Sequence, residues 1–285
     1  MWRGDLCGSK ACLDPADPKV IFGLEPTNAI AYLTAKDYTI TWHWQDILDQ
    51  AHDHAFTVAK AMRLDLLSDI RAALETALQQ GQTLQQFTAN LKPVLQAQGW
   101  WGQRVIVDSQ GSAETVQLGS PRRLKTIYQT NLQSAYMAGR KAGMEQTTET
   151  HPYWMYIAIL DGKTRSSHRA MHGQVFRHDD PIWSTIFPPN GFNCRCRVIA
   201  LSEAAVKRRG LIVISSQGRT FTETVETGTD KRTGEIRTAT VGGIRITNAQ
   251  GHTITFRTDP GFNHAPGTGL AEARKRKQAN PLPTG

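Results

Sequence analysis

The chain has little cysteine and no long hydrophobic run. Only four of its 285 residues are cysteine, and its longest nearly unbroken hydrophobic stretch, Tyr153 to Leu160, is far shorter than the roughly 20 residues of a membrane-spanning helix. The N-terminal sequence MWRGDLCGSK carries charge but lacks the hydrophobic region of a secretory signal. We therefore expect a soluble protein without a membrane partner. It should remain in a reducing compartment, where a disulfide framework is not expected.

Positive charge is concentrated in the second part of the sequence. The net charge is +8 overall, but it is −4 over residues 1–120 and +12 over residues 121–285. This asymmetry predicts two units with different partners, of which the basic unit would approach a polyanion such as DNA. The alternative is that the excess charge only maintains solubility.

Helical periodicity dominates the first half of the sequence. Hydrophobic residues at helical spacing predict helices over 28–36, 41–55, 63–80, 84–98 and 121–146. Gly81 is a stop signal for the third helix, and Thr83 is an N-cap for the fourth. Gly139 and Gly143 lie four residues apart on the long last helix, which suits close approach of another backbone.

The pattern changes after residue 150. Residues 153–160 and 194–201 are predicted strands, several short β-prone runs follow Gly210, and 103–119 is expected to be a loop with at most one short strand. The predicted class is α+β, with an N-terminal helical unit, a long central helix, a small mixed α/β domain and short C-terminal β-hairpins. The expected divisions are an irregular arm (1–24), an acidic helical domain (25–102), a linker loop (103–120), the mixed domain (121–205), a β-rich extension (206–267) and a flexible basic tail (268–285).

A metal-binding pattern lies within residues 151–201. His168 and His172 have the i, i+4 spacing that puts two imidazoles on one helix face. Cys194 and Cys196 have the i, i+2 spacing that turns two thiols to one side of a strand and Arg195 to the other. Two imidazoles and two thiolates form the ligand set of a structural zinc site. The alternative is that the cysteines are small packed residues and that His172 only precedes a turn.

Two other patterns resemble metal sites more weakly. Cys7 and Cys12 in the N-terminal arm are spaced like a loose zinc pair, but they could equally have no metal role. His52, Asp53 and His54 are adjacent, and neighbouring residues of a helix do not share a face. We therefore predict that these three side chains are solvated.

A catalytic interpretation is available for the same central segment. Asp161, Thr164, Arg165, His168 and Arg169 could form the active site of a metal-dependent nuclease or a toxin-like transferase. However, the sequence has no nucleophile elbow, phosphate-cradling glycine loop or carboxylate pair to support it. We favour a turn capped by Asp161, with Thr164 satisfying backbone donors, and no enzymatic activity.

The motifs of residues 128–201 resemble the head-morphogenesis domain of phage Mu F-like and SPP1-type minor head proteins. The resemblance rests on LDGKTR (160–165), His168, MHG (171–173), DDP (179–181), Trp183 and PPNGFNCRCRV (188–198), preceded by the lead-in helix from Tyr128. Upstream, 56–60, 81–87 and GWWG (99–102) are similar to the Mu-like helical region, and DPGFN (259–263) is similar to its closing motif. The family-motif residues are Asp161, Thr164, Arg165, Gly173, Pro189 and Gly191.

The resemblance implies a phage minor head protein that acts in capsid assembly. The expected partners are the portal, other head proteins and, non-specifically, packaged DNA, and the expected location is the capsid interior or portal vertex after assembly in the host cytoplasm. Many relatives have Cys-x₂-Cys where this chain has Arg165 and His168, so His172 would have to complete the zinc ligand set. The candidate nucleic-acid-binding residues are Arg274, Lys275, Arg276 and Lys277.

Overall fold

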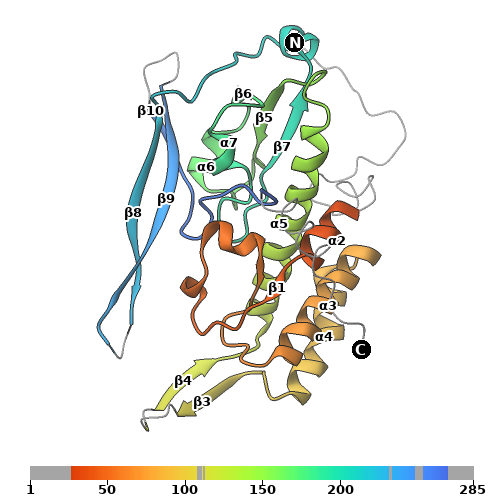
Figure 1. The fold of residues 1–285 in the computed structure, drawn as a ribbon, viewed down its shortest axis with the longest axis vertical. Helices are drawn as coiled ribbons and strands as arrows, with labels where there is room; N and C mark the ends of the chain where they lie inside the picture. Colours follow the sequence, from red (N-terminus) through yellow and green to blue (C-terminus); the bar gives the residue numbers. More distant parts are fainter. Residues whose placement is uncertain (1–26, 108–110, 112, 231–232, 248–252, 269–285) are drawn as a thin grey trace, which may run out of the picture.

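The computed structural model describes residues 27–107, 111, 113–230, 233–247 and 253–268 (Figure 1). Four helices form the N-terminal half, namely α2 (Thr27–Thr34), α3 (Leu64–Gln80), α4 (Leu84–Ala97) and the long α5 (Pro121–Glu145). Together with the small sheets that follow, they confirm the predicted α+β class. No helix among the described residues is long and apolar enough to cross a membrane.

The predicted turn chemistry between α3 and α4 is confirmed. Gly81 ends α3 with φ 62°, a left-handed conformation that glycine adopts without a Cβ clash. The side chain of Thr83 then accepts a hydrogen bond from the Gln86 amide, while the Gln86 side chain accepts one from the Thr83 amide. This capping box begins α4 directly, so the two helices pack against each other as neighbours.

The predicted helix over 41–55 is wrong. Two 3₁₀ turns, η1 (Trp44–Asp46) and η2 (Asp49–Asp53), replace it, and they lie between the short parallel strands β1 (Asp37–Tyr38) and β2 (Ala55–Phe56). The Asp46 carboxylate accepts hydrogen bonds from the amides of Trp42 and His43. Asp49 has φ 51°, outside the right-handed helical region. Local side-chain hydrogen bonding and one left-handed residue therefore interrupt the helical period.

The segment after α4 is a β-hairpin. Strands β3 (Gln103–Val107) and β4 (Ala113–Gln117) pair antiparallel, where the sequence predicts a loop with at most one strand. The β-branched residues Val105, Ile106 and Val107 suit a strand once a partner is present. In Figure 1 this hairpin projects from the lower end of the molecule.

Helix α5 connects two hydrophobic cores. Its first part, including Leu124 and Leu132, packs in the core of α2, α3 and α4, whereas Met137 and Met144 belong to the core of the central sheet. A Cβ on Gly139 would lie 3.2 Å from the Ala29 amide nitrogen, which confirms the predicted close backbone approach. A Cβ on Gly143 would meet nothing within 4 Å, so that prediction is wrong for the second glycine.

The central sheet has the order β6–β5–β7 and is antiparallel throughout. Its strands are β5 (Tyr153–Ile157), β6 (Val175–Arg177) and β7 (Arg197–Leu201), accompanied by the short helices α6 (Ser166–Ala170), α7 (Trp183–Ile186) and α8 (Glu203–Arg208). Trp183 is 3% exposed and belongs to the core, and its ring lies 5.7 Å from that of Trp154.

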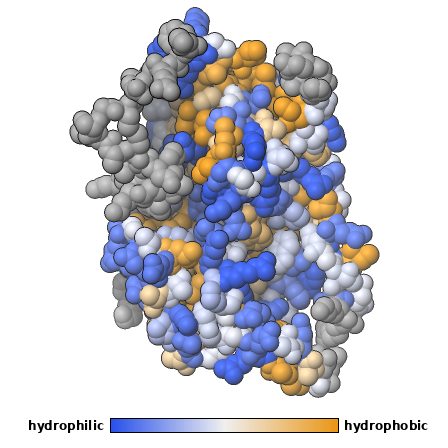
Figure 2. Space-filling view, turned by 180° about the vertical axis from the view of Figure 1, so that it is seen from behind, coloured by the Kyte–Doolittle hydropathy of each residue, from blue (hydrophilic) through white to orange (hydrophobic). Residues whose placement is uncertain are grey.

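The C-terminal region forms a second three-stranded antiparallel sheet, ordered β10–β9–β8 (Figure 1). Its strands are β8 (Thr220–Thr229), β9 (Ile236–Thr247) and β10 (Thr253–Arg257). Among the β-prone runs that follow Gly210, EIRTATV (235–241) and GIRITN (243–248) contribute to one strand, β9, which ends at Thr247. The run LIVIS (211–215) contributes only a single bridge at Val213. The face in Figure 2 is mostly hydrophilic across its middle and lower parts, with hydrophobic patches above.

Candidate metal centre

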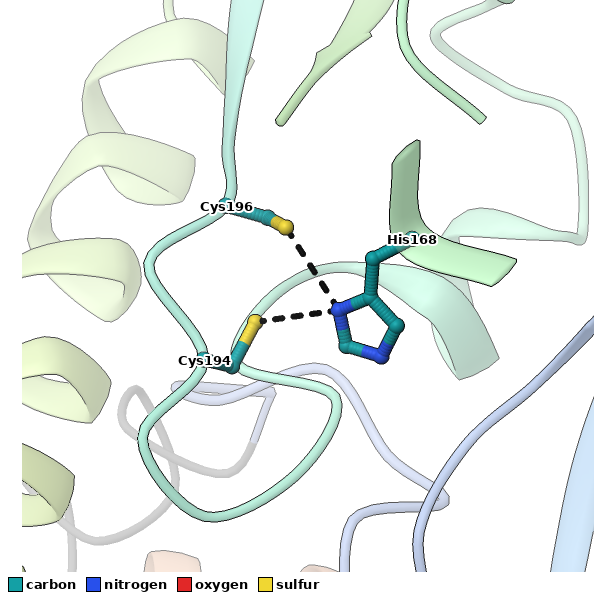
Figure 3. Close-up of side chains that lie close together, drawn as sticks. All are labelled: His168, Cys194 and Cys196. Atoms are coloured by element: carbon teal, nitrogen blue, oxygen red, sulfur yellow. Dashed lines mark hydrogen bonds between the residues drawn. The ribbon is translucent and has the colours of Figure 1, made fainter. Parts of the chain in front are cut away.

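Three of the four predicted zinc ligands lie together in the core. The His168 Nδ1 atom is 3.7 Å from the Cys194 Sγ atom and 3.5 Å from the Cys196 Sγ atom (Figure 3). All three side chains are buried, with exposures of 2%, 6% and 2%. Among the described residues they form the only group of three or more potential His, Cys, Asp or Glu ligands whose atoms lie within 4.8 Å of one another.

Separate elements bring these ligands together. His168 belongs to the five-residue helix α6, and the two cysteines lie in the extended segment that leads into β7. Both thiols point toward His168 (Figure 3). The Arg195 side chain between them pairs with Asp161 instead, as the i, i+2 spacing predicts. The Tyr156 side chain, buried beside the cysteines, accepts a hydrogen bond from Asn190 Nδ2 at 3.1 Å.

The two thiols have different pKa values. A hydrogen bond between their sulfur atoms lowers the pKa of Cys194 well below its usual value and raises that of Cys196, because one sulfur holds the proton that the other accepts. Burial opposes ionisation of both groups, while His168 favours the Cys194 thiolate. Both pKa shifts thus arise because the two thiols are packed against each other and beside His168.

His172 does not join this cluster. Helix α6 ends at Ala170, so the i, i+4 relation with His168 is not realised on a helix. The His172 Nδ1 atom instead accepts a hydrogen bond from the Ala158 amide at 3.2 Å, and the side chain is exposed. The following residue, Gly173, has φ 83° and turns the chain toward β6. The His172 side chain thus contacts the Ala158 backbone and is not part of the group that His168 forms with the two thiols.

The Asp161 side chain caps a turn, as the sequence predicts. Its carboxylate forms a bidentate ion pair with Arg195 at 2.8 and 2.6 Å, and it also accepts hydrogen bonds from the Lys163 amide and the Thr164 hydroxyl. The hydrogen bond from Arg195 is the main reason that the pKa of Asp161 lies well below its usual range. Asp161 and His168 thus contact different partners, in contrast to the shared site that the catalytic alternative requires.

The remaining family-motif residues hold the loop before the cysteines. Arg165 Nη2 donates to Asp259 Oδ2 at 2.6 Å and to the Phe192 carbonyl at 3.1 Å. A Cβ on Gly191 would lie 2.1 Å from Asp259 Oδ2, so this position requires glycine. Pro189, preceded by a cis peptide bond, leads into this glycine. The sequence marks Asp259 only as part of a closing motif, because its partners lie far away in the chain.

Asn190 is a second residue whose role the sequence does not predict. It is fully buried, and its Nδ2 donates to the Tyr156 hydroxyl and, at 2.9 Å, to the Ile186 carbonyl. Its own carbonyl accepts a hydrogen bond from the Asp259 amide at 3.0 Å. The sequence Pro-Pro-Asn-Gly predicts a turn. The burial of Asn190 depends on packing against distant parts of the chain, which the local sequence does not show.

The prediction that His52, Asp53 and His54 are solvated is wrong, because Asp53 is buried and both histidines are half-buried. Asp53 is 2% exposed, and its Oδ1 atom accepts hydrogen bonds from the Tyr32 hydroxyl at 2.7 Å and the Gly267 amide at 3.1 Å. Burial acts to raise the pKa of Asp53, but His264, Tyr32 and Gly267 outweigh it and lower the pKa to about 2. Because 3₁₀ turns replace the expected helix, the argument from helical faces does not apply here.

Two sets of predicted residues lie outside the described part of the chain. These are the loose cysteine pair, Cys7 and Cys12, and the basic residues Arg274, Lys275, Arg276 and Lys277.

Comparisons with known proteins match this chain to one family. Residues 68–199 match the family described as Phage Mu protein F like protein. The chain is 48% identical over 248 residues to the putative capsid assembly protein F of Escherichia phage Mu, covering 86% of this chain and 55% of that protein. It is 44% identical over 244 residues to the Mu-like prophage FluMu F protein of Haemophilus influenzae, covering 84% and 57%. The chain thus spans a little over half the length of these relatives, and no solved structure matches it significantly.

Proposed function

The chain belongs to the phage Mu F-like proteins through residues 68–199, and on this premise we propose that it acts in the assembly of a phage head. The observation that carries the proposal is the 48% identity over 248 residues to a protein named as a putative capsid assembly protein. That alignment is longer than the family domain, so it includes sequence outside residues 68–199. A shared assembly role explains similarity over such a length.

We propose that the protein takes part in head assembly by binding other head proteins and that it catalyses no reaction. Exposed hydrophobic side chains on the projecting β3–β4 hairpin support a binding role. Val105 and Val107 are 66% and 61% exposed, and they have the alternate spacing of one strand face. Enzymatic use of Asp161 and His168 lacks comparable support, because Arg195 pairs with the first and the second is 2% exposed.

Deletion of the gene in the encoding phage or prophage tests the assembly role. We expect lysates with few infectious particles and with aberrant or empty heads in electron micrographs, both restored by the wild-type gene supplied in trans. Normal heads and an unchanged titre after deletion would contradict the proposal.

A double variant, Val105→Lys with Val107→Lys, tests the hairpin. Since both side chains are exposed, the variant should fold but complement the deletion poorly. Ile212→Lys is the matched control, because Ile212 is 79% exposed and lies outside the hairpin. Equal complementation by both variants would exclude the hairpin as a binding surface.

We further propose the portal as one partner and packaged DNA as a non-specific second. The resemblance to minor head proteins supports the first, and the charge of +12 over residues 121–285 supports the second. The protein would then lie in the virion, in the capsid interior or at the portal vertex, after assembly in the host cytoplasm. Co-purification with portal rings and mass spectrometry of purified virions test these placements, and absence from both preparations would contradict them.

DNA binding is tested by its salt dependence. Neutralising Arg274, Lys275, Arg276 and Lys277 to alanine should weaken binding equally for unrelated DNA sequences and make it less sensitive to salt. The comparison variant replaces two exposed arginines elsewhere with alanine, namely Arg208 at the end of α8 and Arg209 at its C-terminal cap. Binding of the wild type that persists at high salt would contradict a phosphate-dominated contact.

A further inference from the structure

The cluster of His168, Cys194 and Cys196 has a geometry that the proposed assembly role does not explain. We propose that it is a zinc site in which the chain provides three ligands, the Nδ1 atom of His168 and the two Sγ atoms, and solvent provides the fourth. This inference does not depend on the assembly role.

The distances match a tetrahedral ion. With Zn–S bonds of about 2.3 Å and a Zn–N bond of about 2.0 Å, tetrahedral angles put nitrogen and sulfur ligands roughly 3.6 Å apart. The Nδ1 atom of His168 lies 3.7 and 3.5 Å from the Sγ atoms of Cys194 and Cys196. Both sulfur atoms face the same ring nitrogen (Figure 3). The ligands are therefore already spaced as the ion requires.

Hydrogen bonds do not satisfy every polar atom of this cluster. The Nδ1 atom of His168 has one in-plane direction for a proton or a lone pair, yet the sulfur atoms of both Cys194 and Cys196 lie close to it. One proton cannot form two near-linear hydrogen bonds. The other ring nitrogen, Nε2, is buried without a hydrogen-bond partner among the described residues, so the polar contacts of the ring are those at Nδ1. An ion at the common point would contact all three atoms.

Charge balance favours a divalent ion in this buried position. Two thiolates offset the two positive charges of Zn²⁺, and a neutral imidazole adds none, so the centre would have no net charge. A neutral centre avoids the large cost of burying an unpaired ion. Soft thiolates with an imidazole favour zinc over magnesium or calcium, which prefer oxygen ligands.

The site would hold together elements that have little regular structure of their own. Helix α6 has five residues, too few to be stable alone. Its His168 ring contacts Phe256 of β10 at a centroid distance of 5.2 Å, and the cysteines lie in the segment that leads into β7. The ion would therefore connect α6 to the central sheet at the point where the C-terminal sheet contacts it.

The experiment measures zinc bound to the full chain purified under reducing conditions. The background variant is Cys7→Ser with Cys12→Ser, so that Cys194 and Cys196 are the only thiols. We expect about one zinc per chain in both the wild type and this background. In the background, both thiols should react with a thiol reagent only after chelation. No zinc in the wild type, even after the reduced protein is incubated with Zn²⁺, would overturn the proposal.

Ligand identity is tested with matched histidine variants. His168→Ala should reduce bound zinc more than tenfold, whereas His172→Ala should retain it, because the His172 side chain contacts Ala158 outside the cluster. Cys194→Ser should behave like His168→Ala. Loss of zinc in His172→Ala or in the Cys7/Cys12 background, with full retention in His168→Ala, would place the metal elsewhere.

X-ray absorption on the wild type keeps the assignment testable if the ligand variants fail to fold. The expected spectrum has two sulfur neighbours at about 2.3 Å and two nitrogen or oxygen neighbours at about 2.0 Å. Four sulfur neighbours or none would overturn the three-ligand assignment.

Discussion

The helical unit, formed by α2, α3 and α4, and the central unit, formed around β5, β6 and β7, share α5 but are stabilised in different ways. In the helical unit, Leu67, Ile70 and Leu74 follow the helical repeat and are fully buried. In the central unit, the ring of Trp154 lies within 6 Å of those of Trp183 and Phe187 (5.7 and 5.8 Å). A fully buried amide, Asn190, lies in the same unit. Stability in the first unit thus depends on a repeated pattern, and in the second on particular side chains.

The largest expected difference concerns the aromatic core. Trp183→Ala should lower the free energy of unfolding by about 3–5 kcal/mol, since it removes a buried ring and the Nε1 hydrogen bond to the Arg177 carbonyl. In the helical unit, Leu74→Met conserves volume and should cost less than about 1.5 kcal/mol. Urea unfolding followed by circular dichroism measures both.

A conservative change makes this comparison sharper. Trp183→Phe keeps an aromatic ring but leaves the Arg177 carbonyl without its donor. It should therefore cost more than Leu74→Met. If the two conservative variants have equal stability, the central core is as tolerant as the helical one and the proposed difference is wrong.

The next effect concerns the loop that precedes the cysteines. Gly191→Ala should cost up to about 3 kcal/mol, because the new Cβ would overlap the Asp259 carboxylate, which Arg165 holds in place. Asp259→Ala alone should cost about 1 kcal/mol through the lost ion pair. In the double variant the steric cost should largely disappear. Additive effects of the two changes would show that the overlap is not the cause.

A smaller effect concerns Asp53, which contacts the segment 264–267 that follows the C-terminal sheet. Its pKa of about 2 in the folded state is below the ordinary 3.8, so the unfolded chain binds its proton first as the pH falls. The stabilisation is therefore complete above about pH 4, and roughly 2 kcal/mol is lost between about pH 4 and 2. Urea unfolding across this range measures the loss.

Asp53→Asn is the variant for this measurement. It should be less stable near neutral pH, and its stability should depend less on pH between about 4 and 2. Asp65→Asn is the control, since Asp65 pairs with Arg63 on the surface. The same acid dependence in wild type and Asp53→Asn would exclude Asp53 as the cause.

The smallest expected effect separates two glycines of α5. Gly143→Ala should raise the free energy of unfolding by up to about 1 kcal/mol, because alanine favours the helix and its Cβ would meet nothing within 4 Å. Gly139→Ala should gain less or lose stability, since its Cβ would crowd Ala29. Thermal unfolding of both variants measures the difference. Equal gains would mean that α2 can move away from α5 at little cost.

Periodic packing and local caps were determined by the sequence itself. The hydrophobic repeat of α3 predicts its buried face, and the Gly81 and Thr83 signals predict where α3 ends and α4 begins. The spacing of Cys194 and Cys196 predicts their common direction. These features depend on residues within a few positions of one another, so the sequence contains all the information that they need.

Contacts between distant segments were decided only by the tertiary structure. The sequence does not separate His168 from His172, because both fit the same spacing. The end of α6 at Ala170 and the contact of His172 with Ala158 make the distinction. It does not bring Asp259 to Gly191, or Asp53 to Gly267, because each partner is many residues away. A hydrophobic repeat reports the local period of the backbone, whereas the partner of a buried polar group depends on how whole elements pack.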